Sequence, residues 1–482
     1  MSPIQNVVNF SKTVQSYLPF EANTTQKEAI EKLSEFIYDP NERSVFVLKG
    51  YAGTGKSNLI SAFALALPSI KWRSVLLAPT GRAAKVLSSY SKRPAQTIHK
   101  KIFKKVQDVD GSVGFVLTEN LHRNTLFVVD EASMISVEKS QLSYENSLLE
   151  NLFEYIFSGH NCKLILVGDT AQLPPVGSSE SLALNKDFLQ RSFSLQIALV
   201  ELNEVVRQKL NSGILVVATD IRESIGIVPF QLPKIMCNKD VYRLSGEELE
   251  FELNSSISKY GEDQVTIITR SNKGCNLYNQ HFRNRIKYFE EDLCVGDKIM
   301  VVKNNYYWLE EIAETAFIAN GDTAEIIRII NRESLYGFNF CECLIKLSDY
   351  PNLAELQVKI ITNCLYTDSP ALTEIEQKQL YQNVMEDMQH EPLKHIRSAY
   401  LKKSPYYNAL QVKFKYAITC HKAQGGQWPC VFIDMGFVKA DDLNDNFYRW
   451  LYTAITRASE KVILINFSDQ LFDEEMDKRY EA

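Results

Sequence analysis

The sequence predicts an α/β fold built from parallel sheets that helices cover on both faces. Short apolar runs, typical of buried strands, alternate with helical patterns up to about residue 200 and again beyond it. The run Val45–Leu48 leads into the glycine-rich segment GYAGTGKS (Gly50–Ser57), which a helical stretch, Asn58–Leu67, follows. With 482 residues, the chain is long enough for about two to four domains.

The loop from Gly50 to Ser57 predicts a site for a nucleoside triphosphate and Mg²⁺. Its glycines permit backbone conformations that let several N–H groups converge on phosphate oxygens, beside the positive end of a helix. We expect Lys56 to reach the β- and γ-phosphates and the Ser57 hydroxyl to bind Mg²⁺. The alternative is a glycine turn that binds nothing, which the strand–loop–helix context disfavours.

Further buried strands end in polar clusters, at the sheet edge where ligands bind in such folds. These strands are Val75–Ala78, Leu126–Val129, Leu164–Val167, Val265–Ile268, Val431–Asp434 and Val462–Ile465. Between about 290 and 410 the pattern changes to short strands after turns, Gly296–Val302 and Gly321–Ile327, which predict a small antiparallel barrel. Residues 369–400 predict a helical segment. We interpret the whole stretch as an insertion into a second α/β domain.

The N-terminal residues predict two helices. Residues 1–22 are an amphipathic lead-in, which we expect to pack on the first domain. A helix is predicted to begin at Thr24–Thr25, with a threonine as N-cap and Glu28 as its capping-box partner.

Two carboxylates follow the strand Leu126–Val129. Phosphoryl transfer requires one carboxylate near Mg²⁺, for which Asp130 is suited, and one group that orients or deprotonates water, for which Glu131 is suited. A solvated turn is the alternative. The phosphate-binding loop Gly50–Ser57 (the P-loop), which lies earlier in the chain, favours the catalytic interpretation. In GDTAQLPP, Gln172 is expected to sense the γ-phosphate, the alternative being an incidental polar group in a proline-rich loop.

Two arginines of the second α/β unit, Arg207 and Arg457, occur in short motifs far from the P-loop in sequence. An arginine supplied across a domain cleft stabilises the transferring phosphoryl group, with an effect of about 10³–10⁵ on rate. A surface charge is the usual role of a single helical arginine. We expect both side chains to complete the nucleotide site.

Composition excludes some classes of protein. The net charge of −6 argues against a uniformly basic coat protein, although a local basic channel is compatible with it. Nine cysteines without paired C-x-x-C spacing predict reduced buried thiols rather than a zinc site. The sequence has no apolar run near the roughly 20 residues of a membrane span and no signal-peptide layout at its start. We expect a soluble, cytoplasmic protein with no membrane partner.

The motifs as a set carry a family resemblance. In chain order they are Gln26, GYAGTGKS, APTGRAA (Ala78–Ala84), QTIH (Gln96–His99), VVDEAS, GDTAQLPPVG, LNEVVRQ, ITCHKAQGGQW (Ile418–Trp428) and LYTAITRA (Leu451–Ala458). This order, spread over residues 26–458, resembles superfamily 1 helicases and, within them, the 1B group that contains RecD and Dda. The resemblance implies an ATP-dependent motor that moves 5′ to 3′ on single-stranded DNA and unwinds duplex DNA.

The resemblance also implies a domain plan of two RecA-like domains with an inserted SH3-like barrel and a helical arm. It consists of a lead-in (1–22), domain 1A (23–200) with a short pin-like insertion (about 101–122), domain 2A (201–290 and 410–482) and inserted domain 2B (291–409), whose arm covers about 369–400. The insertion 101–122 is short, which puts a full-size pin domain in doubt. The sequence shows no nuclease-like cluster of carboxylates and lysine.

Site residues follow by matching position. For ATP and Mg²⁺, the resemblance implies Gln26 (adenine edge), Gly53, Thr54, Gly55, Lys56, Ser57 and Gly425, with Ser57 and Asp130 at the metal and Lys56, Asp130, Glu131, Gln172, Arg207 and Arg457 as catalytic residues. For DNA it implies Pro79, Thr80, Thr97 and His99 on the first domain and Thr269, Thr419, His421 and Lys422 on the second. Hydroxyl, imidazole and ammonium groups suit phosphate contact without sequence readout.

Several alternatives stay open. His99 is either structural or a DNA contact, and the basic cluster Lys100, Lys101, Lys104 and Lys105 is either a solvated face or a phosphate-facing one. Phe103 or Phe115 either stacks on the base pair at a fork or belongs to the core. The expected partners are single-stranded and forked DNA and single-strand-binding or replication and repair proteins. We expect the protein itself to be a monomer. A nucleotide-gated binding module without unwinding activity and a motor on RNA are the alternative functions.

Overall fold

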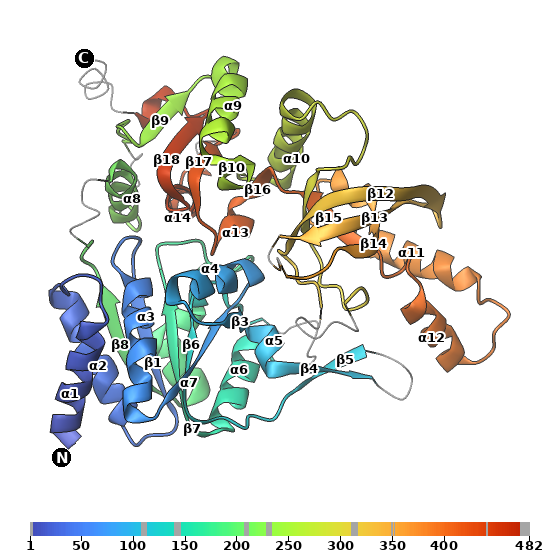
Figure 1. Cartoon of the computed structure of the whole chain (residues 1–482). Coiled ribbons are helices and arrows are strands. Elements are labelled where there is room, and N and C mark those ends of the chain that lie inside the picture. Colours follow the sequence, from blue (N-terminus) through green and yellow to red (C-terminus); the bar gives the residue numbers. More distant parts are fainter. Residues whose placement is uncertain are drawn as a thin grey trace.

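The computed structural model describes residues 3–107, 113–138, 146–206, 212–227, 234–309, 317–348, 350, 352–439 and 442–472. Two parallel sheets and a closed barrel form its framework (Figure 1). The first sheet has the strand order β3-β2-β6-β7-β1-β8 and the second the order β16-β10-β17-β18-β9. This arrangement confirms the predicted α/β fold with two P-loop-type domains and an inserted barrel.

The first sheet is buried between two layers of helices. Its strands are β1 (Ser44–Gly50), β2 (Arg73–Ala78), β3 (Ala95–Thr97), β6 (Arg123–Val129), β7 (His160–Gly168) and β8 (Gln196–Leu202). Its helices are α1 (Pro3–Ser16), α2 (Thr24–Tyr38), α3 (Lys56–Ala66), α4 (Gly81–Ser91), α5 (Ile98–Ile102), α6 (Leu148–Phe157) and α7 (Lys186–Phe193). Because successive side chains of a strand point to opposite faces, Phe46 packs against α1–α3 whereas Val47 packs on the side of α6. The buried Phe10 and Val14 of α1 join the first of these cores.

The second sheet carries the C-terminal motifs. Its strands are β9 (Val241–Leu244), β10 (Val265–Thr269), β16 (Ala417–Thr419), β17 (Trp428–Asp434) and β18 (Ala458–Ile465). Its helices are α8 (Gly213–Glu223), α9 (Leu249–Tyr260), α10 (Asn272–His281), α13 (Cys420–Ala423) and α14 (Asp445–Ile455). The buried Tyr448 and Leu451 of α14 pack in one core with Ile221 of α8, while Leu253 of α9 belongs to the core on the other face.

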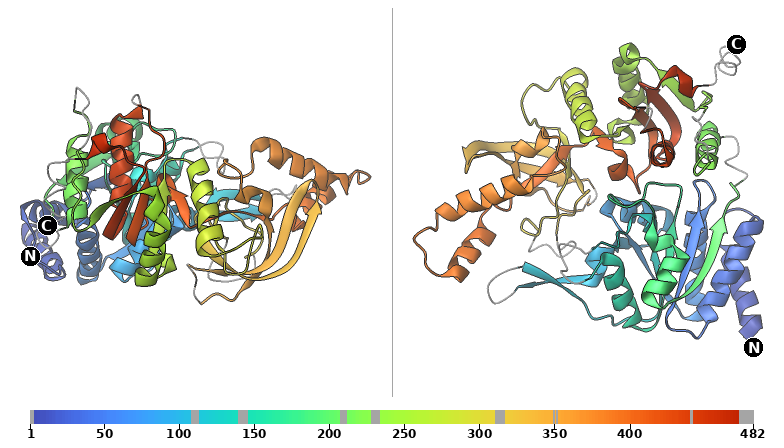
Figure 2. Two further views of the ribbon diagram at one scale, coloured as in Figure 1. Left: turned by 90° about the horizontal axis from the view of Figure 1, so that it is seen from above. Right: turned by 180° about the vertical axis from the view of Figure 1, so that it is seen from behind.

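The inserted barrel closes through five strands, β11 (Lys298–Val301), β12 (Thr323–Leu335), β13 (Phe338–Leu347), β14 (Leu356–Ile361) and β15 (Leu410–Phe414). Between β14 and β15 the chain forms the arm helices α11 (Glu374–Glu386) and α12 (Lys394–Lys403), which project from the barrel away from the two α/β domains (Figure 2). Strand β15 lies beyond the predicted limit of the insertion at 409. The other predicted domain limits stay predictions.

The predicted pin-like insertion contains a hairpin, β4 (Phe103–Gln107) and β5 (Val113–Leu117), which extends toward the barrel (Figure 1). The Phe115 ring lies 4.7 Å from the ring of Tyr306, which precedes the barrel strand β12. Phe103 instead packs against the core of the first domain. Of the two aromatic candidates, Phe103 has the core role and Phe115 contacts the barrel.

The cap of α2 differs from the prediction. Asn23 is the N-cap, and its side chain accepts a hydrogen bond from the Gln26 N–H while the Gln26 side chain accepts one from the Asn23 N–H. The prediction of a threonine cap with Glu28 was wrong because asparagine is at least as good an N-cap as threonine and lies one residue earlier. Within the described ranges, no helix combines the length and apolar character needed to cross a bilayer.

Candidate functional site

The glycine-rich loop connects β1 to α3 in the predicted manner. Gly53 and Gly55 have φ of +78° and +86°, in the left-handed region that favours glycine. Gly55 is the N-cap of α3, so the first turn of the helix presents its N–H groups beside the loop. This is the local geometry that binds phosphate.

Lys56 is folded onto the loop, where its ammonium group donates hydrogen bonds to the carbonyls of Gly50 and Tyr51. Thr54 also donates to the Tyr51 carbonyl, at 2.8 Å. The cationic group is therefore held at the mouth of the P-loop. Phosphate oxygens that enter the loop would find Lys56 beside them.

The two groups predicted to bind metal, Ser57 and Asp130, share a neighbour. The Tyr90 hydroxyl donates a hydrogen bond to the Asp130 carboxylate and interacts with the Ser57 side chain. Burial and the charge of Asp130 raise the pKa of Tyr90. Sequence reasoning missed Tyr90 because α4 carries no motif at that position. A hydroxyl and a carboxylate are the oxygen ligands that Mg²⁺ prefers, so this pair fits the predicted metal.

Glu131 has the environment of a general base. It has φ of +52°, which is strained for a residue with a side chain, and it caps the short 3-10 helix Ala132–Met134. Burial raises the pKa of its carboxyl to about 7, against the opposing charge of Arg457. A carboxyl group with such a pKa exchanges protons near neutral pH, as a base that accepts a proton from water must.

Gln172 carries an unsatisfied acceptor. The residue is 5% exposed, and the Oε1 atom has no hydrogen-bond partner among the described residues. A buried polar atom left in this state costs about 1–3 kcal/mol, which favours a ligand or a water molecule as the missing partner. The predicted role of Gln172, which is to sense the γ-phosphate and couple it to movement of the loop, stays a prediction that this unpaired buried oxygen supports.

Helix α14 of the second domain connects the P-loop to the loop that carries Gln172. The Tyr452 hydroxyl accepts a hydrogen bond from the Ala52 N–H at 2.8 Å and donates one to the Asp169 carboxylate at 2.7 Å. The Leu173 N–H donates to the Thr453 hydroxyl at 2.9 Å. Tyr452 lies in the motif LYTAITRA, but the sequence alone did not assign it a role. These hydrogen bonds of Tyr452 and Thr453 form a polar interface between the two domains beside the P-loop.

Arg457 lies in the same polar interface between the domains. It is 6% exposed, and its guanidinium group donates to the carbonyls of Thr453 and Gly426 at 3.0 and 3.2 Å. The guanidinium lies 3.9 Å from the Glu131 carboxylate. The structure therefore brings Arg457 to the predicted base from another domain. Arg207 lies outside the described residues.

Gly425 is also at the domain boundary. Its φ is +71°, and a Cβ placed there would lie 2.6 Å from the Cβ of Ala83 in α4. Next to it, the Arg82 guanidinium stacks on the Trp428 ring at 4.0 Å. Gly425 thus permits the close approach of the first and second domains.

Gln26 supports the P-loop from the side. Its Nε2 donates to the Thr54 carbonyl at 2.9 Å, and its Oε1 accepts from the Asn23 N–H at 3.1 Å. Both ends of the amide are engaged within the protein, and the residue is 2% exposed. The predicted contact with adenine stays a prediction.

A cavity of about 310 Å³ lies between the two domains and the barrel. It gathers six of the predicted DNA contacts, Pro79, Thr80, Thr97 and His99 from the first domain and His421 and Lys422 from the second. The hydroxyls of Thr80 and Thr97 accept from the N–H groups of Ala83 and Lys100, so each retains a proton to donate. Burial lowers the pKa of Lys422 and of both histidines.

The remaining two predicted DNA contacts lie elsewhere. Thr419 lines a much smaller neighbouring space with Lys422. Thr269 is 1% exposed, and its hydroxyl donates to the Ser271 carbonyl at 2.9 Å. The structure does not bring Thr269 into the cavity. Of the basic cluster, Lys100 and Lys101 are half-buried and Lys104 is exposed, and the side chain of Lys105 lies outside the described set.

Two residues join this cavity to the nucleotide site. Gln424 lines the cavity, and its Nε2 donates to the Leu173 carbonyl at 2.7 Å, in the loop that carries Gln172. Met134 also lines the cavity, and its N–H donates to the Glu131 carbonyl at 3.0 Å. Sequence reasoning assigned neither residue a role. A ligand in the cavity would therefore contact residues that are bonded to the loop of Gln172 and to Glu131.

The raised pKa of Glu131 predicts an acid limb in the pH profile of turnover. Because only the deprotonated carboxylate accepts a proton, kcat/KM for ATP should fall as the pH drops below about 7. Steady-state turnover between pH 5.5 and 9 checks this. A flat profile down to pH 5.5 would show that the ionisation of Glu131 does not limit the reaction.

Tyr452→Phe should weaken the polar interface between the domains. The change leaves the Ala52 N–H and an Asp169 oxygen without their hydroxyl partner, so turnover stimulated by nucleic acid should fall roughly tenfold or more. Tyr242→Phe is the matched control because that hydroxyl donates only to the nearby Lys239 carbonyl on the exposed edge of the second sheet. Equal turnover in the two variants would argue against a coupling role for Tyr452.

The fold and the loop Gly50–Ser57 define a P-loop protein in which the predicted catalytic residues Glu131 and Arg457 come from two domains. An AAA domain model matches residues 21–225, and a model of the UvrD-like helicase C-terminal domain matches residues 414–465. The resemblance to superfamily 1B helicases of the RecD and Dda type, which the motifs predict, is confirmed by these matches and by the relatives below.

Three curated relatives show the extent of the similarity. The uncharacterized protein R530 of Acanthamoeba polyphaga mimivirus is 26% identical over 511 residues, covering 91% of this chain and 99% of its own. The ATP-dependent DNA helicase dda of Enterobacteria phage T4 is 28% identical over 298 residues, 59% of this chain and 62% of that protein. The RecBCD enzyme subunit RecD of Buchnera aphidicola is 22% identical over 465 residues, 87% of this chain and 70% of its own. Among solved structures, the Pif1 helicase from Candida albicans aligns over 96% of this chain and 98% of its own with a TM-score of 0.47 and 14% identity.

Proposed function

We propose that this protein is an ATP-dependent DNA helicase that moves along single-stranded DNA and unwinds duplex DNA. The observation that carries the proposal is the pair of links from the interdomain cavity to the catalytic loops, through Gln424 to the loop of Gln172 and through Met134 to Glu131. A motor requires contact energy at the track to depend on the state of the nucleotide. These links supply a direct path between the two sites.

The residues of the nucleotide site have complementary tasks. The N–H groups of Gly53–Ser57 and the Lys56 ammonium bind phosphate oxygens, and Ser57 and Asp130 would hold Mg²⁺. When bound, MgATP supplies the phosphoryl group whose transfer to water drives the motion. Gln172 orients the attacking water, Glu131 accepts its proton, and Arg457 neutralises the charge that develops.

Closure of the two domains couples this chemistry to the track. Because Arg457 approaches Glu131 from the second domain, the site is complete only when the domains lie together. The cavity with His99 and Lys422 lies at the same boundary between the domains. Opening and closing of the two domains therefore changes how tightly the cavity binds a strand. The two domains bind the strand more tightly in turn, and this alternation moves the protein along it.

The finer features of the proposal come from the helicase resemblance. T4 dda is named an ATP-dependent DNA helicase, and we propose the same activity here with 5′ to 3′ movement. We further propose that the protein works as a monomer in the cytoplasm, with single-strand-binding or replication and repair proteins as its partners. Hydroxyl, imidazole and ammonium contacts to the backbone suit tracking without sequence preference.

The test is the turnover of ATP with no nucleic acid, with single-stranded DNA and with RNA of the same sequence. We expect DNA to raise the turnover well above the basal rate and above the rate with RNA. Unstimulated turnover would favour the nucleotide-gated binding module instead. Stronger stimulation by RNA would identify an RNA motor.

A further inference from the structure

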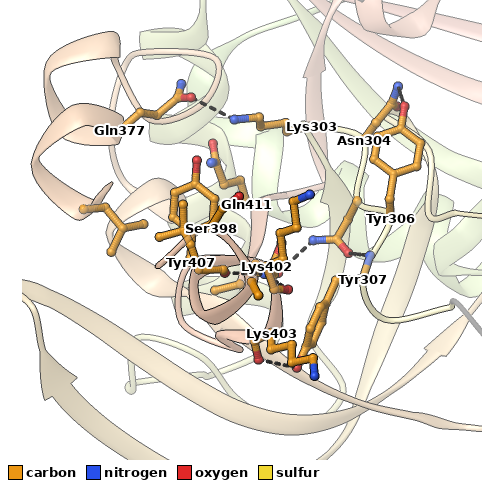
Figure 3. A pocket seen from close by; sticks show the side chains of 16 residues that line it. Lys303, Asn304, Tyr306, Tyr307, Gln377, Ser398, Lys402, Lys403, Tyr407 and Gln411 are labelled. Atoms are coloured by element: carbon orange, nitrogen blue, oxygen red, sulfur yellow. Dashed lines mark hydrogen bonds between the residues drawn. The ribbon is translucent and has the colours of Figure 1, made fainter. Parts of the chain in front are cut away.

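A second cavity, of about 760 Å³, lies between the barrel and the arm (Figure 3). One wall is the segment Lys303–Tyr307, which follows β11, and the other consists of α11, α12 and the residues after α12. Its volume is within the roughly 300–1,000 Å³ of sites that hold small ligands. Its described lining residues include none of the predicted ATP-site residues and none of the predicted DNA contacts.

Lys402 contributes a positive charge to this cavity. Its Nζ atom is buried and has no hydrogen-bond partner among the described residues, and Figure 3 shows its side chain among the lining residues. The end of α12 is fixed because the Asn408 amide donates to the Lys402 carbonyl at 2.9 Å, while the Asn408 carbonyl accepts from the Trp308 indole at 2.9 Å. Burying an unpaired ammonium group is costly, so the arrangement favours an anionic ligand.

The other lining residues narrow the class of anion. Lys303 and Lys403 add two more positive charges, and Tyr306, Tyr307 and Tyr407 add aromatic rings. The described lining residues include no Asp or Glu, although the chain as a whole has a net charge of −6. Lysines interleaved with aromatic rings are typical of surfaces that bind single-stranded nucleic acid, because rings stack on bases while ammonium groups bind phosphates.

An aromatic wedge separates this cavity from the interdomain one. The Tyr306 ring lies 4.7 Å from Phe115 of the hairpin and 4.9 Å from Phe317. Tyr306 lines the barrel–arm cavity, Phe317 lines the interdomain cavity, and Asn304 lines both. The two cavities are therefore neighbours on either side of the wedge formed by Phe115, Tyr306 and Phe317.

We propose that the barrel–arm cavity binds the strand displaced from the duplex, while the interdomain cavity holds the strand that the motor tracks. This inference rests on the proposed helicase function. A duplex that meets the wedge parts there, and the phosphates and bases of the displaced strand contact Lys402 and the lining tyrosines. Holding this strand on the arm hinders re-pairing with its complement.

The test is the equilibrium affinity for three DNAs that share one duplex, measured without ATP. One is a fork with two single-stranded tails, and the others have only one tail each. The normal protein should bind the fork more tightly than either single-tailed duplex. Lys402→Met should bind the fork no more tightly than the single-tailed duplexes. It should also reduce the magnitude of the negative slope of log affinity against log salt by about 1. Lys402→Arg should retain the gain because it keeps the charge.

Lys378→Met is the matched control, since Lys378 lies exposed on α11 and does not line the cavity. Turnover stimulated by an unpaired strand should be normal in all three variants, which shows that the motor is folded. A Lys402→Met protein that keeps the full fork gain would overturn the proposal. So would equal weakening for an isolated strand, which would make the cavity part of the track. If DNA did not stimulate ATP turnover in the normal protein, the proposed helicase function would be contradicted instead. The difference in affinity between the fork and the single-tailed duplexes would still test the role of the cavity.

Discussion

Replacing Glu131 with glutamine should reduce ATP turnover by about 10²–10⁴-fold while ATP binding is retained. The amide has nearly the shape of the carboxylate but cannot accept the proton of the attacking water. The groups proposed to hold the phosphates, which are the P-loop N–H groups and Lys56, are untouched. Turnover at saturating DNA, together with the Kd of a nonhydrolysable ATP analogue, checks both parts.

Glu138→Gln is a suitable control because Glu138 is exposed and belongs to the same segment after β6. It should leave turnover unchanged. Loss of analogue binding in Glu131→Gln, rather than loss of turnover, would indicate that Glu131 has a structural role in its strained backbone conformation.

Arg457→Lys should have the second large effect, a loss of about 10³–10⁵ in turnover. Lysine retains the charge but cannot reproduce the planar group that bonds the Thr453 and Gly426 carbonyls and faces Glu131. ATP should still bind, because the P-loop belongs to the other domain. The measurement is single-turnover hydrolysis with DNA present.

Arg243→Lys in the same domain is the control, since Arg243 pairs with Asp469 at the surface. It should leave hydrolysis unchanged and retain normal thermal unfolding. Hydrolysis by Arg457→Lys at the normal rate would contradict the claim that the second domain completes the catalytic site.

Local patterns predicted much of the fold and of the nucleotide site. Strand β1, the loop Gly50–Ser57 and helix α3 are adjacent in sequence, so composition and spacing were enough to predict them. Asp130 and Glu131 likewise follow their strand directly. The barrel was predicted from turn-flanked strands, although β15 could not be separated from the strands of the second sheet by its apolar run alone.

Contacts between distant segments could not be predicted in this way. Tyr452 and Asp169 are 283 residues apart, and the bond between Gln424 and Leu173 spans 251 residues. Nothing in the local sequence distinguishes Tyr90 or Lys402 from other tyrosines and lysines on helices. Their significance depends on what the folded chain places beside them, a carboxylate for Tyr90 and, for Lys402, a cavity whose described lining residues include no carboxylate.

The central claim is that ATP turnover drives this protein along one DNA strand and thereby separates a duplex. Strand displacement from two otherwise identical duplexes, one with only a 5′ tail and one with only a 3′ tail, tests it most directly. We predict ATP- and Mg²⁺-dependent displacement from the duplex with the 5′ tail and little from the other. Displacement from neither duplex, in a preparation that hydrolyses ATP, would contradict the claim.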